Sequence, residues 1–272
     1  MTRRMIFHHP LPLFPDAASA SGIRPVQMKR AFEELGYEVW QVTGYTGERG
    51  RLAAEVRYAV RCGVRFDFCY SESSTMPMTM TNPTHLPTRP FLDLRFFRSL
   101  RRNGIPVGQF LRDIYWVFPD YRESLPFLKL RAALAAYEWD MRTLRHHVDR
   151  VFLPSLKVGE YINLGNVPIS ALEPGHGHAE PLPGPGEGVS LFYVGGIGSD
   201  YKLHELFAAV KQAWEEKSLD VRLIVCLRPE DWDAVKHEYE QWACPAIEVV
   251  HGHGNVLQEY FERTNVATIV VD

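Results

Sequence analysis

Residues 169–188 read ISALEPGHGHAEPLPGPGEG, and this stretch divides the 272-residue sequence into two halves. Prolines and glycines recur through it, and this composition is typical of a linker. On either side, short apolar runs alternate with longer helical patterns, which indicates parallel βαβ units. The sequence therefore predicts two Rossmann-like α/β domains, over residues 1–168 and 189–272, joined by a linker over 169–188.

The alternation predicts the positions of most strands and helices. Strands are expected over 5–9, 37–43, 66–70, 105–111 and 150–153, and after the linker over 189–194, 221–227, 247–250 and 266–271. Helices are expected over 25–35, 52–62, 91–102, 125–147, 202–214, 229–242 and 255–262, with Pro25 in the first helical turn and Gly36 ending that helix. The last strand reaches Asp272, about two βα units short of a usual domain of this type, so the second domain is expected to be incomplete.

Composition and charge exclude several classes of protein. Hydrophobic residues make up 46% and charged residues 23% of the chain, close to averages for soluble globular proteins. The formal net charge of -3 disfavours nucleic-acid binding, which usually needs a basic excess. The four cysteines have neither metal-ligand nor disulfide spacing, and prolines interrupt the apolar N-terminal stretch that imitates a signal peptide. We therefore expect a cytoplasmic protein.

The first candidate site is a loop between a strand and a helix, which reads SASGIR over residues 19–24. Backbone N–H groups at a helix N-terminus favour an anion, and Gly22 would let a ligand approach the backbone closely. The alternative is an ordinary turn in which Ser21 or Gly22 caps the helix, and residue chemistry alone favours it. Because the loop lacks the G-x-G-x-x-G pattern, a nicotinamide-dependent oxidoreductase loses its main support.

A second glycine-rich turn, Gly195-Gly196-Ile197-Gly198, follows the first strand after the linker. Three glycines in four positions indicate a tight turn with exposed N–H groups, which suits a diphosphate. Lys202, in the first turn of the next helix, would add a positive charge. Close packing of a helix against the sheet explains the glycines equally well.

Polar side chains also follow two strands of the first half. Arg112 and Asp113 end the strand over 105–111, and Glu72 ends the strand over 66–70. Because ligands of open parallel sheets bind at the carboxyl ends of strands, Arg112 and Asp113 are placed to orient a hydroxyl or a leaving phosphate. Glu72 is placed to contact a sugar. The alternatives are a structural ion pair at Arg112–Asp113 and a solvated turn at Glu72. We favour a functional role for Arg112 and Asp113, but not for Glu72.

Two other patterns have less specific meanings. The sequences His176-Gly177-His178 and His251-Gly252-His253 lack the nearby Cys, Asp or Glu residues of a zinc site, so no metal is expected. The helix over 91–102 is apolar on a wide face and basic elsewhere, so it can lie on anionic lipid. Covering the core of the domain is the more common role of such a helix.

Taken together, these segments resemble the GT-B glycosyltransferases, in particular the large retaining group (group 1, or family 4) that includes bacterial enzymes of cell-surface polysaccharide synthesis. The resemblance spans the whole chain and is carried by SGIRP at 21–25, YSESS at 70–74, FLRDIYW at 110–116, VFLPS at 151–155 and YVGGIG at 193–198. It implies a hexosyltransferase that moves a sugar from a nucleoside-diphosphate sugar to a glycan or lipid-linked acceptor. Such an enzyme is cytoplasmic or lies at the inner face of the membrane.

The resemblance also implies roles for individual residues. Arg112 and Asp113 would be the catalytic pair beside the reacting sugar, and Ser21 and Glu72 would lie on the acceptor side. The donor phosphates would be bound by Gly22, Gly195, Gly196, Lys202 and Arg228. Cationic and N–H groups stabilise the negative charge that develops on the departing nucleoside diphosphate, so neither a metal nor another cofactor is then required.

The sequence departs from the family pattern in its second half. The usual Gly-Arg pair reads Gly195-Gly196, and the usual Lys-Gly pair reads Lys202-Leu203. The Glu-x7-Glu motif that holds the donor in this family would lie beyond Asp272, so this chain is expected to bind a donor poorly and to turn over slowly or not at all. Two alternatives stay open: a non-catalytic glycosyltransferase-like binding or scaffold protein, and a sugar-nucleotide epimerase of the same fold.

Overall fold

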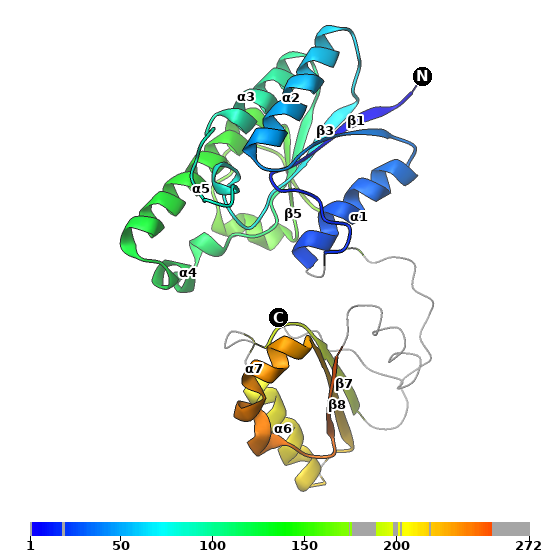
Figure 1. Cartoon of the computed structure of the whole chain (residues 1–272), viewed down its shortest axis with the longest axis vertical. Helices are drawn as coiled ribbons and strands as arrows, with labels where there is room; N and C mark the ends of the chain where they lie inside the picture. The colour runs from blue at the N-terminus through cyan, green and yellow to red at the C-terminus, as the bar shows by residue number, and fades with distance from the viewer. Residues whose placement is uncertain are drawn as a thin grey trace. The chain divides into compact units, whose positions relative to one another are not determined.

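A computed structural model describes residues 2–17, 20–173, 175, 189–197, 201, 203–217 and 219–251 of the chain. The chain divides into two compact units, Met1–Gly175 and His176–Asp272 (Figure 1). Each unit contains its own parallel sheet, which confirms the predicted α/β class. The expected helix over 255–262 and strand over 266–271 lie outside the described residues.

The first unit is built on a six-stranded sheet of order β2-β1-β3-β4-β5-β6, in which every neighbouring pair is parallel. Its strands are β1 (Arg4–His9), β2 (Glu38–Thr43), β3 (Phe68–Glu72), β4 (Val107–Phe110), β5 (Arg150–Leu153) and β6 (Ile169–Ala171). Its helices are α1 (Ala20–Glu34), α2 (Thr46–Arg61), α3 (Leu92–Arg102), α4 (Pro119–Ser124) and α5 (Phe127–His147), with 3-10 turns η1 (Met78–Met80), η2 (Tyr115–Val117) and η3 (Leu156–Tyr161).

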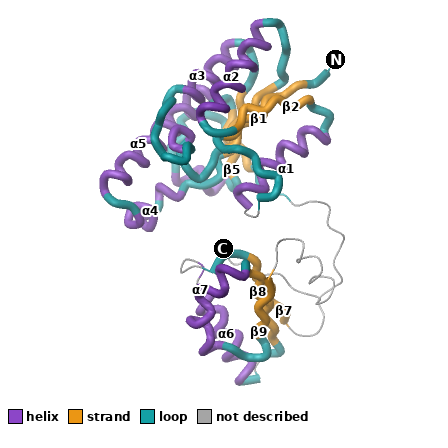
Figure 2. The backbone as a smooth tube through the Cα atoms, in the orientation of Figure 1, coloured by secondary structure: helices purple, strands orange, loops and turns teal. Residues whose placement is uncertain are grey.

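Both faces of this sheet are covered, as the near-continuous apolar strands require. Met5 and Phe7 of β1 pack on one face with residues of α1, whereas Ile6 packs on the other with α2, α3 and α5. This alternation follows from the two-residue period of a strand. Figure 2 shows the strands between these two layers of helices. The layers leave the carboxyl ends of the strands at a single edge.

Helix α1 begins at Ala20, so the prediction that Pro25 occupies the first helical turn is wrong. A proline inside a helix leaves the carbonyl four residues earlier without its N–H donor. That carbonyl belongs to Ser21, and the Arg112 guanidinium donates to it through Nη1 at 3.0 Å. A distant side chain therefore replaces the missing backbone donor, and the helix extends through the SGIRP segment.

The residues assigned to the start of the linker form an edge strand instead. Ile169–Ala171 pairs with β5 as β6, with Val151 opposite Ile169 and Leu153 opposite Ala171. Backbone bonds from Val151 N to Pro168 O (2.9 Å) and from Leu172 N to Leu153 O (2.7 Å) extend this pairing. The open edge of β5 supplies the partners, which no local pattern reveals. Of the remaining expected linker, residues 174 and 176–188 lie outside the described part.

The second unit contains a three-stranded parallel sheet of order β7-β8-β9. Its strands are β7 (Val189–Val194), β8 (Val221–Leu227) and β9 (Ile247–His251), and its helices are α6 (Leu203–Glu215) and α7 (Pro229–Tyr239), followed by the 3-10 turn η5 (Glu240–Trp242). Phe207 of α6 and Tyr239 of α7 pack with the buried side chains of β8. Among the helices described in both units, none is long and apolar enough to span a bilayer.

Candidate functional site

Polar side chains gather at the carboxyl edge of the first sheet, where β1, β3 and β4 end side by side. His9 is the last residue of β1, Glu72 is the last residue of β3, and Arg112 and Asp113 follow β4 by two and three residues. The parallel register sets Glu72 opposite Phe110, and Ser73 N donates to the Phe110 carbonyl at 2.9 Å. This edge is where open α/β sheets bind ligands.

Arg112 connects three segments of the chain. Its Nη1 donates to the Ser21 carbonyl at 3.0 Å, and its Nη2 donates to the Thr75 hydroxyl at 2.8 Å. Its backbone N–H donates to Ser73 Oγ at 3.0 Å. The structure therefore joins two residues predicted to be functional, Ser21 and Arg112, through the carbonyl of the former. Ser21 and Gly22 lie in the first turn of α1, not in the expected loop before it.

Asp113 lies beside this guanidinium with one oxygen bonded and the other without a partner. Its Oδ2 accepts from the Thr75 hydroxyl at 3.0 Å and has a longer contact of 3.4 Å with Arg112 Nε. Its Oδ1 is buried and has no hydrogen-bond partner among the described residues. Burial raises the pKa of Asp113, although Thr75 and Arg112 oppose the change. The carboxylate is thus a comparatively basic acceptor, with one oxygen that is buried and unpaired among the described residues.

Glu72 is fully buried and holds Arg24 of α1. The two side chains face each other at 3.1 Å (Nε to Oε1), in an ionic contact without hydrogen-bond geometry. The Tyr70 hydroxyl donates to Glu72 Oε2 at 3.2 Å, and the Arg24 guanidinium lies 3.7 Å from the centre of the Phe110 ring. Burial raises the pKa of Glu72 despite the opposing charge of Arg24. The expected direct contact between Glu72 and a sugar does not fit this burial, because the carboxylate faces Arg24.

His9 belongs to this group as well, although no pattern in the sequence indicated a role for it. Its Nδ1 lies 3.0 Å from the Glu72 carbonyl oxygen, which can only accept, so Nδ1 carries the proton and donates. Burial, to which the charge of the nearby Arg112 adds, lowers the pKa of His9 to about 4. The ring is therefore neutral at pH 7, with the lone pair on Nε2.

A buried polar network lies directly behind the site. His8, paired in register with Ser71, has its Nδ1 2.8 Å from Ser71 Oγ and its Nε2 3.0 Å from Asp93 Oδ1. Arg49 donates to both Asp93 oxygens, at 2.9 and 3.1 Å. Burial alone would raise the pKa of Asp93, but Arg49 and His8 outweigh it and the pKa is lowered. Burial lowers the pKa of His8.

This serine–histidine–carboxylate arrangement braces the strands and does not form a hydrolytic site. Ser71 and His8 have no accessible surface, and Asp93 is only 5% exposed, so no substrate reaches them. The network ties β1 and β3 to α2 and α3 behind the carboxyl edge. Arg49, His8 and Asp93 were missed from the sequence; a histidine within an apolar strand was the one signal, because a buried polar group must find a partner.

In the second unit, Gly195 and Gly196, which follow β7, lie close to tyrosine side chains. A Cβ on Gly195 would lie 2.7 Å from the Tyr193 hydroxyl, and one on Gly196 would lie 2.7 Å from the Tyr201 ring. The Tyr193 hydroxyl donates to the Gly196 carbonyl at 2.6 Å. These contacts come from tyrosine side chains and not from a helix packed on the sheet, so the packing and the diphosphate interpretations of both glycines stay predictions. Gly198 and Lys202 lie outside the described residues.

Arg228 directly precedes α7 and is paired but accessible. Its Nε lies 2.7 Å from Asp231 Oδ2, and its side chain is 55% exposed. Both Arg228 and the glycine turn lie at the carboxyl ends of neighbouring strands, β8 and β7. Over the described parts of both units, no group of three or more His, Cys, Asp and Glu side chains is placed to hold a metal ion.

Helix α3 is a covering helix. Phe96, Phe97 and Leu100 are at most 1% exposed and belong to the core of the first unit. The apolar face of this helix is therefore occupied, which confirms the covering role that the sequence pattern favoured.

Several solved glycosyltransferases have an architecture similar to that of this chain. A glycosyltransferase from Rickettsia africae ESF-5 superposes with a TM-score of 0.54 at 10% identity, over 99% of this chain and 73% of that one. The α,α-trehalose 6-phosphate synthase of Burkholderia multivorans gives 0.51 at 13% identity, over 97% and 77%. UGT2 of Phytolacca americana, solved with UDP-2-fluoro-glucose and pterostilbene, gives 0.50 at 10% identity, over 98% and 76%.

At these identities the likeness shows the fold alone, and it confirms the GT-B resemblance at that level. No protein-family model matches the chain, and no curated protein sequence matches it.

Proposed function

We propose that the protein is a glycosyltransferase that moves a hexose from a nucleoside-diphosphate sugar to an acceptor hydroxyl. The observation that carries the proposal is the group formed by Arg112, Asp113 and Thr75 at the carboxyl edge of the first sheet, in a chain with the GT-B fold. A uridine diphosphate sugar is the donor to test first, because the structure of UGT2 contains one. A glycan or lipid-linked acceptor and retention of anomeric configuration complete the proposal.

In this reaction the bond between the anomeric carbon and the diphosphate oxygen breaks, and a bond to the acceptor oxygen forms. The leaving diphosphate gains negative charge, which cationic and N–H groups stabilise. Arg112 has five N–H donors, of which three are engaged by Ser21, Thr75 and Asp113. The other two remain for an anionic oxygen. We assign Asp113 Oδ1, which is buried and lacks a protein partner in the described part, the role of accepting the hydrogen bond of a sugar or acceptor hydroxyl, and this role requires the side chain to turn towards the ligand.

The remaining residues of the site act through these two. Glu72 holds Arg24, and Ser21 holds Arg112, so we assign both of the expected acceptor-side residues a positioning role. The neutral His9 ring, with its lone pair on Nε2, offers a second acceptor for a hydroxyl at the same edge. In the second unit, Arg228, Lys202, Gly195 and Gly196 remain the proposed donor contacts.

A thermal-shift measurement with nucleoside diphosphates and their sugars tests the donor. A ligand that binds only the folded chain raises its melting temperature by mass action. Transfer is then followed with the Asp113→Ala variant, which is expected to lose transfer and to keep nucleotide binding. Asp120→Ala, at an exposed position of α4, is the matched control. NMR of the product gives its anomeric configuration.

The outcomes separate the proposal from its alternatives. Nucleotide binding without transfer to any acceptor would favour a non-catalytic binding protein. Consumption of the nucleotide sugar without an acceptor would favour an epimerase. No response to any nucleotide would refute the donor site, and unchanged transfer by Asp113→Ala would remove that residue from the mechanism.

A further inference from the structure

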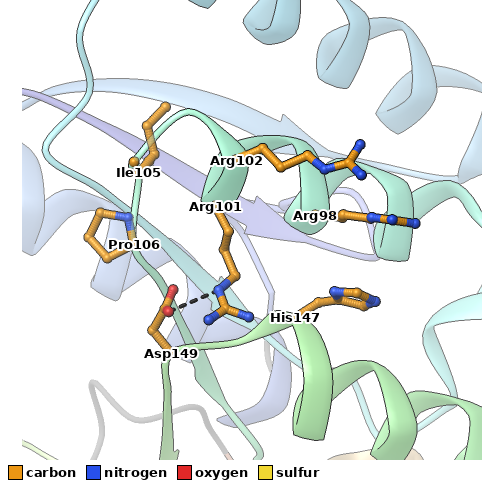
Figure 3. A pocket seen from close by; sticks show the side chains of 8 residues that line it. Arg98, Arg101, Arg102, Ile105, Pro106, His147 and Asp149 are labelled. Carbon is orange, nitrogen blue, oxygen red and sulfur yellow. Dashed lines mark hydrogen bonds and ion pairs between the residues drawn. The ribbon is translucent and has the colours of Figure 1, made fainter.

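A basic pocket lies at the opposite edge of the first sheet, where α3 and α5 end and β4 and β5 begin. Its volume is about 460 Å³, and its lining includes Arg98, Arg101 and Arg102 of α3 together with His147 and Asp149 (Figure 3). Gly104, with a left-handed φ of 73°, turns the chain sharply from α3 towards β4 and forms part of the wall. The pocket uses none of the residues of the site at the carboxyl edge.

One wall of the pocket is fixed by an ion pair. Arg101 Nε donates to Asp149 Oδ1 at 2.9 Å, and its Nη1 donates to the His146 carbonyl at 2.8 Å. Asp149 Oδ2 in turn accepts from the backbone N–H of Val107 at 2.8 Å. Both oxygens of the Asp149 carboxylate are therefore already bonded, one to Arg101 and the other to the backbone at the start of β4.

The other two arginines have no such partner. Arg98 and Arg102 are exposed, and no carboxylate in the described part of the chain pairs with either. Figure 3 shows both guanidinium groups on the side of the pocket where His147 lies, directed away from the Arg101–Asp149 pair. Burial lowers the pKa of His147, and the charges of Arg98, His146 and Arg101 lower it further. Positive charge is thus concentrated here without an internal counter-charge.

Helix ends account for only part of this charge. The C-termini of α3 and α5 each carry about half a negative charge, which favours basic residues in their last turns. Arg101, Arg102 and His147 occupy such positions, whereas Arg98 lies a full turn before Arg102. Three arginines and one aspartate leave two formal positive charges, which the two helix ends reduce to about one. In a protein of net charge -3, this excess indicates an anionic ligand.

We propose that Arg98, Arg102 and His147 form a binding site for a phosphoryl anion, provided either by a free phosphate compound or by a lipid headgroup. The planar N–H forks of two arginines match phosphate oxygens, and a protonated His147 adds a further donor. This site is separate from the proposed transferase site and does not depend on it.

Titration of the full chain with pyrophosphate, followed by calorimetry and by the NMR signal of His147, tests the free-anion source. The bound anion is expected to raise the pKa of His147, because a nearby negative charge favours the imidazolium. Arg98, Arg101 and His146 also act on this ring, and Asp149 lines the same pocket, so the same titration without pyrophosphate gives the reference. Co-sedimentation with phosphatidylglycerol–phosphatidylcholine vesicles at equal ionic strength tests the headgroup source.

The decisive comparison is between two double variants of equal charge. Arg98→Gln/Arg102→Gln is expected to weaken binding roughly tenfold. Arg65→Gln/Arg131→Gln, at exposed positions elsewhere on the same unit, is expected to stay within about twofold. Loss of pyrophosphate binding in the first variant alone supports the site with a free ligand, and loss of vesicle binding alone supports it with a headgroup. No binding in either assay, or equal losses in both variants, would overturn the proposal.

Discussion

Replacing Arg49 by methionine is expected to destabilise the first unit by about 3–5 kcal/mol. Arg49 has no accessible surface, and its guanidinium donates to both oxygens of Asp93, which is 5% exposed. Methionine keeps a long apolar stem but leaves the Asp93 carboxylate buried without its counter-charge. The carbonyl oxygens of Pro10, Gly44 and Met78, bonded at 2.8, 2.6 and 3.2 Å, lose this donor as well.

Hydrogen exchange followed by mass spectrometry measures this loss, because it resolves peptides of the first unit from those of the second. Domains are stable by only about 5–15 kcal/mol, so amides of α2, α3 and β1 are expected to exchange far faster in the variant. Urea denaturation of the same protein gives the corresponding shift in midpoint.

Arg51→Met is the matched control, since Arg51 lies on the same helix and pairs with Glu55 on the surface. Both of these side chains are more than half exposed, so the pair is expected to contribute no more than about 0.5 kcal/mol. A loss below about 1 kcal/mol in Arg49→Met would refute the reasoning, because it would mean that the Asp93 carboxylate does not require a buried partner.

Two further predictions concern the same unit. Burial raises the pKa of Asp140 to about 8, so the folded state retains a proton that the unfolded state releases near pH 4. As pH rises from 5 to 8, the free energy of unfolding is therefore expected to fall by up to about 1.4 kcal/mol per pH unit. Urea denaturation of Asp140→Asn over the same range should show no such fall. Arg112→Ala is expected to lower the free energy of unfolding by about 1 kcal/mol less in a Pro25→Ala background than in the wild type. The reason is that Pro25→Ala restores an N–H that can reach the Ser21 carbonyl. A double-mutant cycle with no coupling would show that this carbonyl does not depend on Arg112.

The elements that followed from the sequence are those with strong local signals. Apolar runs such as residues 221–227 and 150–153 match β8 and β5 residue for residue. The position of Arg112 and Asp113 at a carboxyl edge also followed, because a parallel sheet fixes where every strand ends.

The features that could not be predicted all depend on distant partners. Strand β6 exists because β5 offers an open edge, and its three residues carry no pattern of their own. The network around Arg49 joins residues 44 positions apart in the Arg49–Asp93 pair and 85 apart in the His8–Asp93 pair. The burial of Glu72 likewise depends on Arg24, which reaches it from α1. Local periodicity contains no information about such pairs.

The geometry at Pro25 connects this dependence to the proposed chemistry. Pro25, inside α1, has no N–H to donate to the Ser21 carbonyl, and Arg112 donates to this carbonyl through Nη1. That bond, together with the one to Thr75, fixes the guanidinium before any ligand arrives. An arginine fixed in this way loses little side-chain entropy when it binds an anion, which strengthens electrostatic stabilisation of a leaving group. Pro25, which led the sequence analysis to place the start of α1 too late, is thus one reason why Arg112 has a fixed position at the carboxyl edge.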